Sequence, residues 1–195
     1  LVQSVLEESG SHGFRLTAYR ALRHFHPDDI LLWSRMALDR DDPALTREVA
    51  IALRNVPWSE ESAELLQTVI SRYDGKDRWM LEAIGSAAAG REDVVYRSLV
   101  RPMTAGRSWA GWTGRDINLA WRLRSSEARA HLLQVIKTMK PDIAQFRHLI
   151  MTYALAFTPE ERADNLRYVK ALKSSAGFSG EEFQSTIEEV IQKDL

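Results

Sequence analysis

Few side chains in this sequence have the type and spacing that chemistry requires. His24 and His26 lie at the turn around Pro27, close to Asp28 and Asp29. Imidazole and carboxylate groups are metal ligands, but this spacing fits no standard zinc pattern. We therefore interpret the two histidines as capping or solvent-exposed residues, and we predict no metal site.

Pairs of adjacent carboxylates are the other candidates, because two carboxylates can divide general acid and general base roles. Every pair lies at the expected start of a helix, where capping and the helix dipole account for it. The pairs are Asp28-Asp29, Asp41-Asp42, Glu60-Glu61, Glu160-Glu161 and Glu181-Glu182. The sequence also has no glycine-rich phosphate loop, no Gly-x-Ser-x-Gly and no His-Glu-x-x-His. We predict no catalytic residue and no enzymatic activity in this chain.

Composition narrows the function classes further. Lys and Arg number 26 against 27 Asp and Glu, for a net charge of −1, which argues against a dedicated binder of duplex nucleic acid. There is no cysteine, so disulfides, zinc–thiolate sites and covalent haem attachment are excluded within this chain. No run approaches the ~20 apolar residues of a membrane span. The sequence opens with Leu1 inside a helical pattern, so we expect a domain of a longer protein.

Apolar residues recur with helical spacing along almost the whole chain. We expect helices over 14–25, 30–38, 45–56, 63–73, 78–88, 92–100, 115–123, 126–139, 141–157, 158–174 and 179–193. The best strand candidate, Val94-Val95-Tyr96, lies within helical spacing. The pattern predicts an all-α fold of about twelve helices.

An internal period of 31 residues relates three of the expected helices. The matching residues are Ala21-Leu22, Ala52-Leu53 and Ala83-Ile84, then Ala18, Val49 and Met80, then Arg47 and Arg78. Repeated helix pairs bury their apolar faces by stacking on one another. We predict one domain over 1–195, a right-handed α-solenoid of antiparallel helix pairs of the HEAT or armadillo kind. A closed bundle of four to six helices is the alternative, but it does not require such a repeat.

The segment 104–114 interrupts this regularity. Arg115 follows Arg78 by 37 residues, and the additional length matches this stretch rich in glycine and tryptophan. Insertions in a solenoid form loops on one face, often the binding face. The loop also contains an Arg/Trp group that is typical of a contact surface for a protein, a glycan or a base. The candidate interaction residues are Arg107, Trp109, Trp112, Arg115 and Asp116.

The tryptophans outside this loop have a different setting. Trp33, Trp79 and Trp121 lie in helical stripes, so we predict that they pack in the core or between repeats. For Trp109 and Trp112 two interpretations stay open. Either both indoles are exposed for a partner, or both pack back and fill the inserted loop.

A second charged cluster precedes the helix expected over 78–88. It consists of Asp74, Lys76, Asp77 and Arg78. A ladder of Arg and Asp along successive repeats would stabilise the stack. The same cluster could line one edge of an interaction surface, so its residues are further candidates for contact.

Two motifs are more specific than a generic repeat. The segment Tyr73–Gly85, together with Gly114–Ile117 and Trp121-Arg122, resembles the HEAT-like region of large secreted proteins of planctomycetes and related bacteria. Those proteins combine a sorbosone-dehydrogenase-like propeller, a HEAT-like array and a CxxCH cytochrome c domain. Met80 stands where that family has an aromatic residue, and Asn118-Leu119-Ala120 interrupts the second motif. The resemblance is sharpest over residues 73–125.

The resemblance implies a periplasmic or exported setting and a dehydrogenase-like parent protein that carries c-type haem on another domain. It implies no cofactor in this chain. The array itself would be a non-catalytic protein-interaction or scaffold domain, with a protein or other domains of the parent chain as partner. One alternative is a HEAT-like DNA-binding or DNA-repair glycosylase domain, which would use Trp109, Trp112, Arg115 and Asp116. Another is an enzyme domain with a cleft that the sequence does not reveal.

Overall fold

The computed structural model describes residues 1–138, 143–155, 167, 169–171 and 180–192. All regular elements within these ranges are helical, and none of the residues in them lies in a strand. The all-α class predicted from periodicity is therefore confirmed. The chain forms two compact units, unit 1 (Leu1–Val95) and unit 2 (Tyr96–Leu195).

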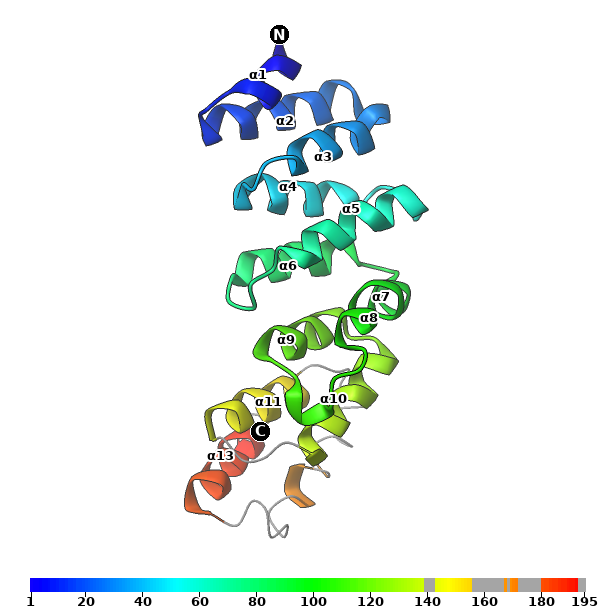
Figure 1. Cartoon of the computed structure of the whole chain (residues 1–195). Coiled ribbons are helices and arrows are strands. Elements are labelled where there is room, and N and C mark those ends of the chain that lie inside the picture. The colour runs from blue at the N-terminus through cyan, green and yellow to red at the C-terminus, as the bar shows by residue number, and fades with distance from the viewer. Residues whose placement is uncertain (139–142, 156–166, 168, 172–179, 193–195) are drawn as a thin grey trace. The chain divides into compact units, whose positions relative to one another are not determined.

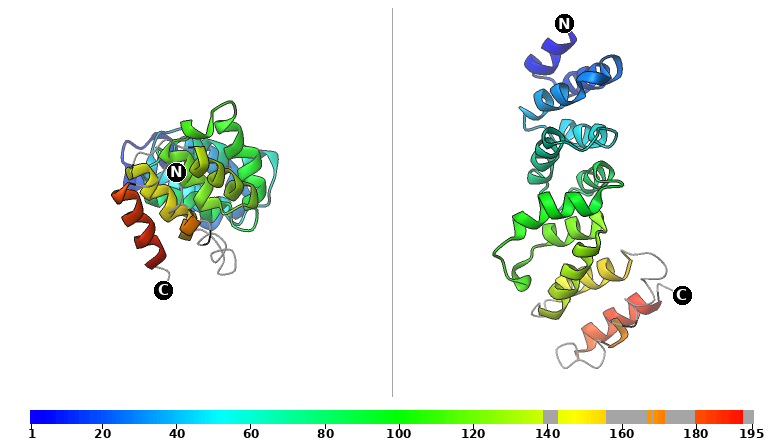
Figure 2. Two further views of the ribbon diagram at one scale, coloured as in Figure 1. Left: turned by 90° about the horizontal axis from the view of Figure 1, so that it is seen from below. Right: turned by 90° about the vertical axis from the view of Figure 1, so that its right-hand side faces the viewer.

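Unit 1 is built from two layers of helices (Figure 1). Its elements are α1 (Val2–Glu8), α2 (His12–Phe25), η1 (Pro27–Asp29), α3 (Ile30–Leu38), α4 (Pro43–Leu53), α5 (Glu60–Ser71), α6 (Arg78–Ala87) and α7 (Glu92–Val95). Helices α2, α4 and α6 contact one another in that order and form one layer, while α1, α3 and α5 form the other. In the right-hand view of Figure 2 the helices of this unit follow one another in chain order from the N-terminal end.

Aspartate side chains cap the starts of α4 and α6. Asp42 accepts hydrogen bonds from the backbone nitrogens of Ala44 at 3.0 Å and Leu45 at 3.3 Å, and Asp77 accepts one from Met80 at 3.0 Å. Such caps satisfy backbone N–H groups that have no partner inside the helix. The capping role predicted for Asp41-Asp42 is confirmed. The Asp28-Asp29 pair differs, because these residues form the 3₁₀ turn η1 and make no side-chain cap at α3.

The structure corrects the repeat period for the third copy. The N-cap residues of α2, α4 and α6 are Ser11, Asp42 and Asp77, so the steps are 31 and 35 residues. Arg47 lies in the middle of α4, whereas Arg78 is the first residue of α6, so the two are not equivalent. A four-residue slip is close to one helical turn of 3.6 residues. A shift of four residues therefore leaves apolar residues aligned with apolar residues, which is why the sequence pattern indicated a step of 31 instead of 35 between α4 and α6.

Arginine side chains join α1 to α3, α3 to α5 and α4 to α6 in unit 1. Arg40 donates to a carbonyl in the last turn of α1 at 2.8 Å, and Arg72 donates to the carbonyl of Leu38 at the end of α3. Arg91 donates to the carbonyl of Val56, just beyond α4, at 2.8 Å. The last carbonyls of a helix have no intrahelical partner. These three guanidinium groups therefore satisfy them while joining successive helix pairs.

Unit 2 is a separate helical assembly. Its elements are the π-helical segment η2 (Tyr96–Val100), α8 (Arg101–Thr104), the 3₁₀ turn η3 (Trp109–Gly111), α9 (Gly114–Leu123), α10 (Ser126–Thr138), α11 (Ile143–Leu155) and α13 (Glu181–Gln192). Helix α10 packs against α9, α11 and η3, and α11 packs against α13. The helix expected over 158–174 lies outside the described residues except at 167 and 169–171.

Candidate functional site

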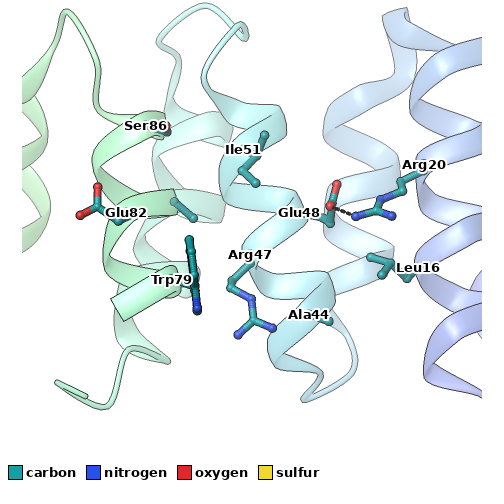
Figure 3. A pocket seen from close by; sticks show the side chains of 10 residues that line it. Leu16, Arg20, Ala44, Arg47, Glu48, Ile51, Trp79, Glu82 and Ser86 are labelled. Atoms are coloured by element: carbon teal, nitrogen blue, oxygen red, sulfur yellow. Dashed lines mark hydrogen bonds and ion pairs between the residues drawn. The ribbon is translucent and has the colours of Figure 1, made fainter. Parts of the chain in front are cut away.

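A groove opens over α4 in unit 1, between α2 and α6 (Figure 3). Its volume is about 380 Å³. It is lined by Leu16 and Arg20 from α2, Ala44, Arg47, Glu48 and Ile51 from α4, and Trp79, Glu82, Ala83 and Ser86 from α6. We call it the α4 groove. Within the described residues it brings together an exposed indole, aliphatic side chains and guanidinium groups.

The floor of the groove is the outward stripe of α4. Ala44, Arg47 and Ile51 recur at helical spacing on the side opposite the buried stripe of Leu45 and Val49. The small side chain of Ala44 leaves the floor low. Ile51 is 46% exposed, so the trough offers an apolar surface that nothing in unit 1 covers.

Trp79 forms the wall on the α6 side. It is 74% exposed, although its neighbour Met80 is 3% exposed. In Figure 3 the indole projects from α6 toward α4, close to Arg47. The prediction that Trp79 packs in the core or between repeats is therefore wrong, because most of the indole is exposed. The same prediction is confirmed for Trp33, which is 8% exposed.

On the α2 side of the groove the carboxylate of Glu48 is less exposed than the guanidinium groups that bind it. Arg20 forms an ion pair with Glu48, and Arg23 approaches the same carboxylate at 3.5 Å. The side chain of Glu48 is 13% exposed against 56% for Arg20. Arg47 pairs with Asp77 at 2.7 Å. Each guanidinium carries five N–H donors, so the arginines keep donors directed to solvent.

The cluster Asp74, Lys76, Asp77 and Arg78 has mainly a local structural role. Asp74 accepts hydrogen bonds from the backbone nitrogens of Asp77 at 2.9 Å and Lys76 at 2.7 Å, and these bonds lower the pKa of its carboxyl. Asp77 caps α6 and binds Arg47. Lys76 and Arg78 are exposed at the rim.

The Arg–Asp ladder expected from the sequence is present, but with other members. Asp42, the N-cap of α4, is 1% exposed. It accepts hydrogen bonds from Arg15 at 2.9 Å and His12 at 2.7 Å. Burial raises the pKa of Asp42, but the side-chain bonds from His12 and Arg15 and the backbone bonds that it accepts as N-cap together lower it more, so the net pKa lies below its ordinary value. The pairs Arg15–Asp42 and Arg47–Asp77 thus join α2 to α4 and α4 to α6.

The 104–114 loop of unit 2 is closed by its own aromatic side chains. Trp112 is 8% exposed, and Trp109 is half-buried. Their ring centroids are 5.5 Å apart, and Trp109 lies 4.9 Å from the ring of His131 on α10. Of the two interpretations left open by the sequence, the structure has the one in which the indoles pack back into the loop.

Arg107 and Asp116 fasten this loop to α9. The two guanidinium nitrogens of Arg107 donate to the two carboxylate oxygens of Asp116 at 2.8 and 2.9 Å, and Thr113 donates through its backbone and hydroxyl at 2.8 and 2.7 Å. Asp116 is 4% exposed. Burial raises its pKa, but the bonds from Arg107 and Thr113 lower it more. Trp112 and Asp116 are therefore buried, contrary to their predicted place on a contact surface.

His131 completes the interior of this region. Its Nδ1 lies 2.9 Å from the hydroxyl of Tyr96, and its Nε2 lies 3.9 Å from Glu127. Burial lowers the pKa of His131, more than Glu127 raises it, which favours the neutral ring. Burial also raises the pKa of Tyr96. The arrangement is a hydrogen-bonded aromatic cluster under the loop.

Two further findings concern metal ions and membranes. Across the described part of the chain, no group of three or more His, Asp or Glu side chains is placed to hold a metal ion. Among the same residues, no helix has both the length and the apolar character that crossing a bilayer requires.

Comparisons of the chain with protein-family models, curated proteins and solved structures find no match. The resemblance carried by Tyr73–Gly85 and Gly114–Ile117 therefore stays a prediction.

Sequence reasoning missed the residues of the α4 groove, although a usable signal was present. On α6, Trp79, Glu82 and Ser86 lie at positions i, i+3 and i+7, a single stripe that holds no aliphatic residue. A helix buries its aliphatic stripe first. The three residues were therefore better candidates for the open face than for the core.

Proposed function

We propose that this chain is a non-catalytic protein-interaction domain that binds a partner in the α4 groove, with Trp79 as the principal contact. One observation carries the proposal, namely that an indole stands 74% exposed beside the 46% exposed Ile51 over a trough of about 380 Å³. Tryptophan and arginine are the residues that most often dominate binding energy at protein interfaces. Large exposed apolar residues grouped together mark such surfaces.

The architecture we propose for the domain is a HEAT-like right-handed α-solenoid. The two layers of unit 1 support it, because α2–α4–α6 and α1–α3–α5 stack in order and are joined by recurring clamps. A solenoid presents one helix layer as an extended binding surface. The α4 groove lies on such a layer. We further propose, on the motif resemblance alone, an exported bacterial parent protein whose redox chemistry belongs to other domains.

The alternative of a DNA-binding or DNA-repair domain has less support. Of its candidate residues, Trp112 and Asp116 are buried, and the carboxylate of Asp116 is occupied by Arg107 and Thr113. The net charge of −1 over the whole chain also argues against a dedicated binder of duplex nucleic acid.

A display library of random dodecapeptides tests the proposed function. It is selected on the whole 195-residue chain and then depleted on the Trp79→Ala variant. We expect families of related peptides that bind the wild type and not the variant. Leu32→Ala is the matched control, because Leu32 is 49% exposed on α3 and does not line the groove. Peptides that bind all three proteins equally, or no enriched peptides at all, would contradict the proposal.

A further inference from the structure

We propose that the α4 groove takes an acidic peptide: an extended segment of a protein partner with an aliphatic anchor flanked by carboxylates. This inference rests on the proposed function, because it names the chemistry of the partner of the same groove. It goes beyond that function in excluding basic and neutral segments of equal hydrophobicity.

The first argument is that the guanidinium groups around Glu48 are more exposed to solvent than its carboxylate. Glu48 is 13% exposed and is bound by two guanidinium groups, those of Arg20 and Arg23. One buried carboxylate between two arginines leaves positive charge on the solvent side. Arg20 is 56% exposed, so an incoming carboxylate reaches its remaining donors without displacing Glu48. Glu82, the other carboxylate of the groove, is half-buried.

Arg47 on the floor of the groove adds positive charge to that of Arg20. Arg47 pairs with Asp77, and the side chains of both are about one-third exposed, at 33% and 28%. Asp77 also caps the backbone of α6, so its oxygens are already engaged on the protein side. The neighbouring Arg78 is exposed. A carboxylate on the partner can therefore approach Arg20 on the α2 side and Arg47 on the floor of the groove, in the geometry that arginine prefers.

The apolar surface between the two walls selects the anchor. Ile51 and Trp79 are exposed, Leu16 is half-buried, and Figure 3 shows the three spread across α4, α6 and α2. An aliphatic side chain seated among them removes apolar area from water on both partners. Basic residues beside this anchor would face Arg20 and Arg47 directly. Like charges across an interface suppress wrong partners.

The width of the layer fixes the length of the segment. Packed helices lie about 8–10 Å apart, so the path from α2 across α4 to α6 is roughly twice that distance. An extended chain advances about 3.3 Å per residue. A segment of about six residues therefore crosses the groove, with the anchor near Ile51 and carboxylates near Arg20 and Arg47.

Three synthetic hexapeptides test the proposal. Each has two central leucines and a terminal fluorescein, and the flanking positions are all glutamate, all glutamine or all lysine. Binding to the whole chain is measured by fluorescence anisotropy at low and at high ionic strength. We expect the glutamate peptide to bind about tenfold more tightly than the glutamine peptide, with an advantage that shrinks at high salt. The lysine peptide should bind more weakly than either.

Variants connect the preference to the groove. Trp79→Ala should weaken binding of the glutamate peptide at least about tenfold, as loss of a central contact does. Arg20→Gln and Arg47→Gln should each reduce the preference for glutamate over glutamine, and Leu32→Ala should change nothing. Circular dichroism of each variant confirms that it is folded.

The possible outcomes separate the two proposals. If the three peptides bind equally and all depend on Trp79, the groove binds peptides but the acidic preference is wrong. If the lysine peptide binds best, the charge argument is reversed and the inference fails. If none of the three binds, the inference fails, while peptides from the display library that depend on Trp79 would still support the proposed function.

Discussion

Trp79 in unit 1 and Trp112 in unit 2 both stand beside the start of a helix and near an Arg–Asp pair, yet their exposures are 74% and 8%. The difference follows from their positions relative to the N-cap. Trp79 comes two residues after the cap Asp77, on the first turn of α6. Trp112 comes one residue before the cap Thr113. A residue just before the cap can fold back against the first turn of the helix, whereas a residue within that turn is exposed or buried according to whether a neighbouring helix covers its face.

The segment 112–117 fits a known arrangement of a helix start. Thr113 and Asp116 form a reciprocal capping box. Trp112 and Ile117 occupy the positions just before the cap and four residues after it, which pack together in a hydrophobic staple, and both are buried. The loop that the sequence presented as the contact surface is therefore a well-formed helix entry. The open indole lies in the regular part of the chain.

The largest difference between the two regions is expected when each tryptophan is replaced with alanine. Trp112→Ala should lower the free energy of unfolding by about 3–5 kcal/mol, the usual effect of removing a large buried aromatic side chain. Trp79→Ala should change it by no more than about 0.5 kcal/mol, as exposed substitutions do. Urea denaturation followed by circular dichroism measures both, and hydrogen exchange assigns the loss to unit 2. Equal effects of the two substitutions would mean that the two indoles do not differ in burial.

A smaller effect is expected from the ion pair that fastens the loop. Arg107→Ala removes two hydrogen bonds to Asp116 and should destabilise unit 2 by about 1.5–3 kcal/mol, the range for bonds to a charged group. Arg35→Ala is the control, because Arg35 and Glu61 form an exposed pair, at 52% and 46%, and exposed pairs contribute about 0–1 kcal/mol. An Arg107 variant as stable as the Arg35 variant would contradict a structural role for the buried pair.

Acidification should lower the stability of unit 2 through His131, without a corresponding effect of this histidine on unit 1. The pKa of His131 lies below its ordinary value of 6.5 because of burial. Between the two values the unfolded chain binds more protons than the folded one, so stability is present above pH 6.5 and falls as the pH is lowered through that window. His131→Gln should reduce this loss in unit 2 and leave exchange from α4 and α6 unchanged. Thermal melts of both proteins at successive pH values measure it. An unchanged pH dependence in the variant would assign the effect to other groups.

Much of the fold could be predicted because its signals are local. The helix expected over 30–38 has those bounds in the structure, and the helix expected over 78–88 begins at Arg78. The helix expected over 45–56 spans Pro43–Leu53 instead. Helix α1 was missed.

The site was harder to predict, because a helical stripe gives the direction of a face but not whether a neighbour covers it. Met80 and Trp79 are adjacent in sequence, and only the packing of α4 against α6 decides which of them is buried. The third repeat was placed one turn off for a related reason. An apolar stripe looks the same after a shift of about one turn.

The smallest predicted effect concerns the ladder at the edge of the α4 groove. Arg47→Ala should destabilise unit 1 by less than about 1 kcal/mol, because a half-exposed pair is screened by solvent. Asp77→Ala removes the same pair and also the cap of α6, so it should cost about 1 kcal/mol more. In the double variant the losses of unfolding free energy from the two substitutions should add, except for the interaction energy between Arg47 and Asp77. A double-mutant cycle measures that interaction energy. A coupling near zero would show that Asp77 acts on α6 alone, and that Arg47 is free to bind a partner's carboxylate at no expense to the stack.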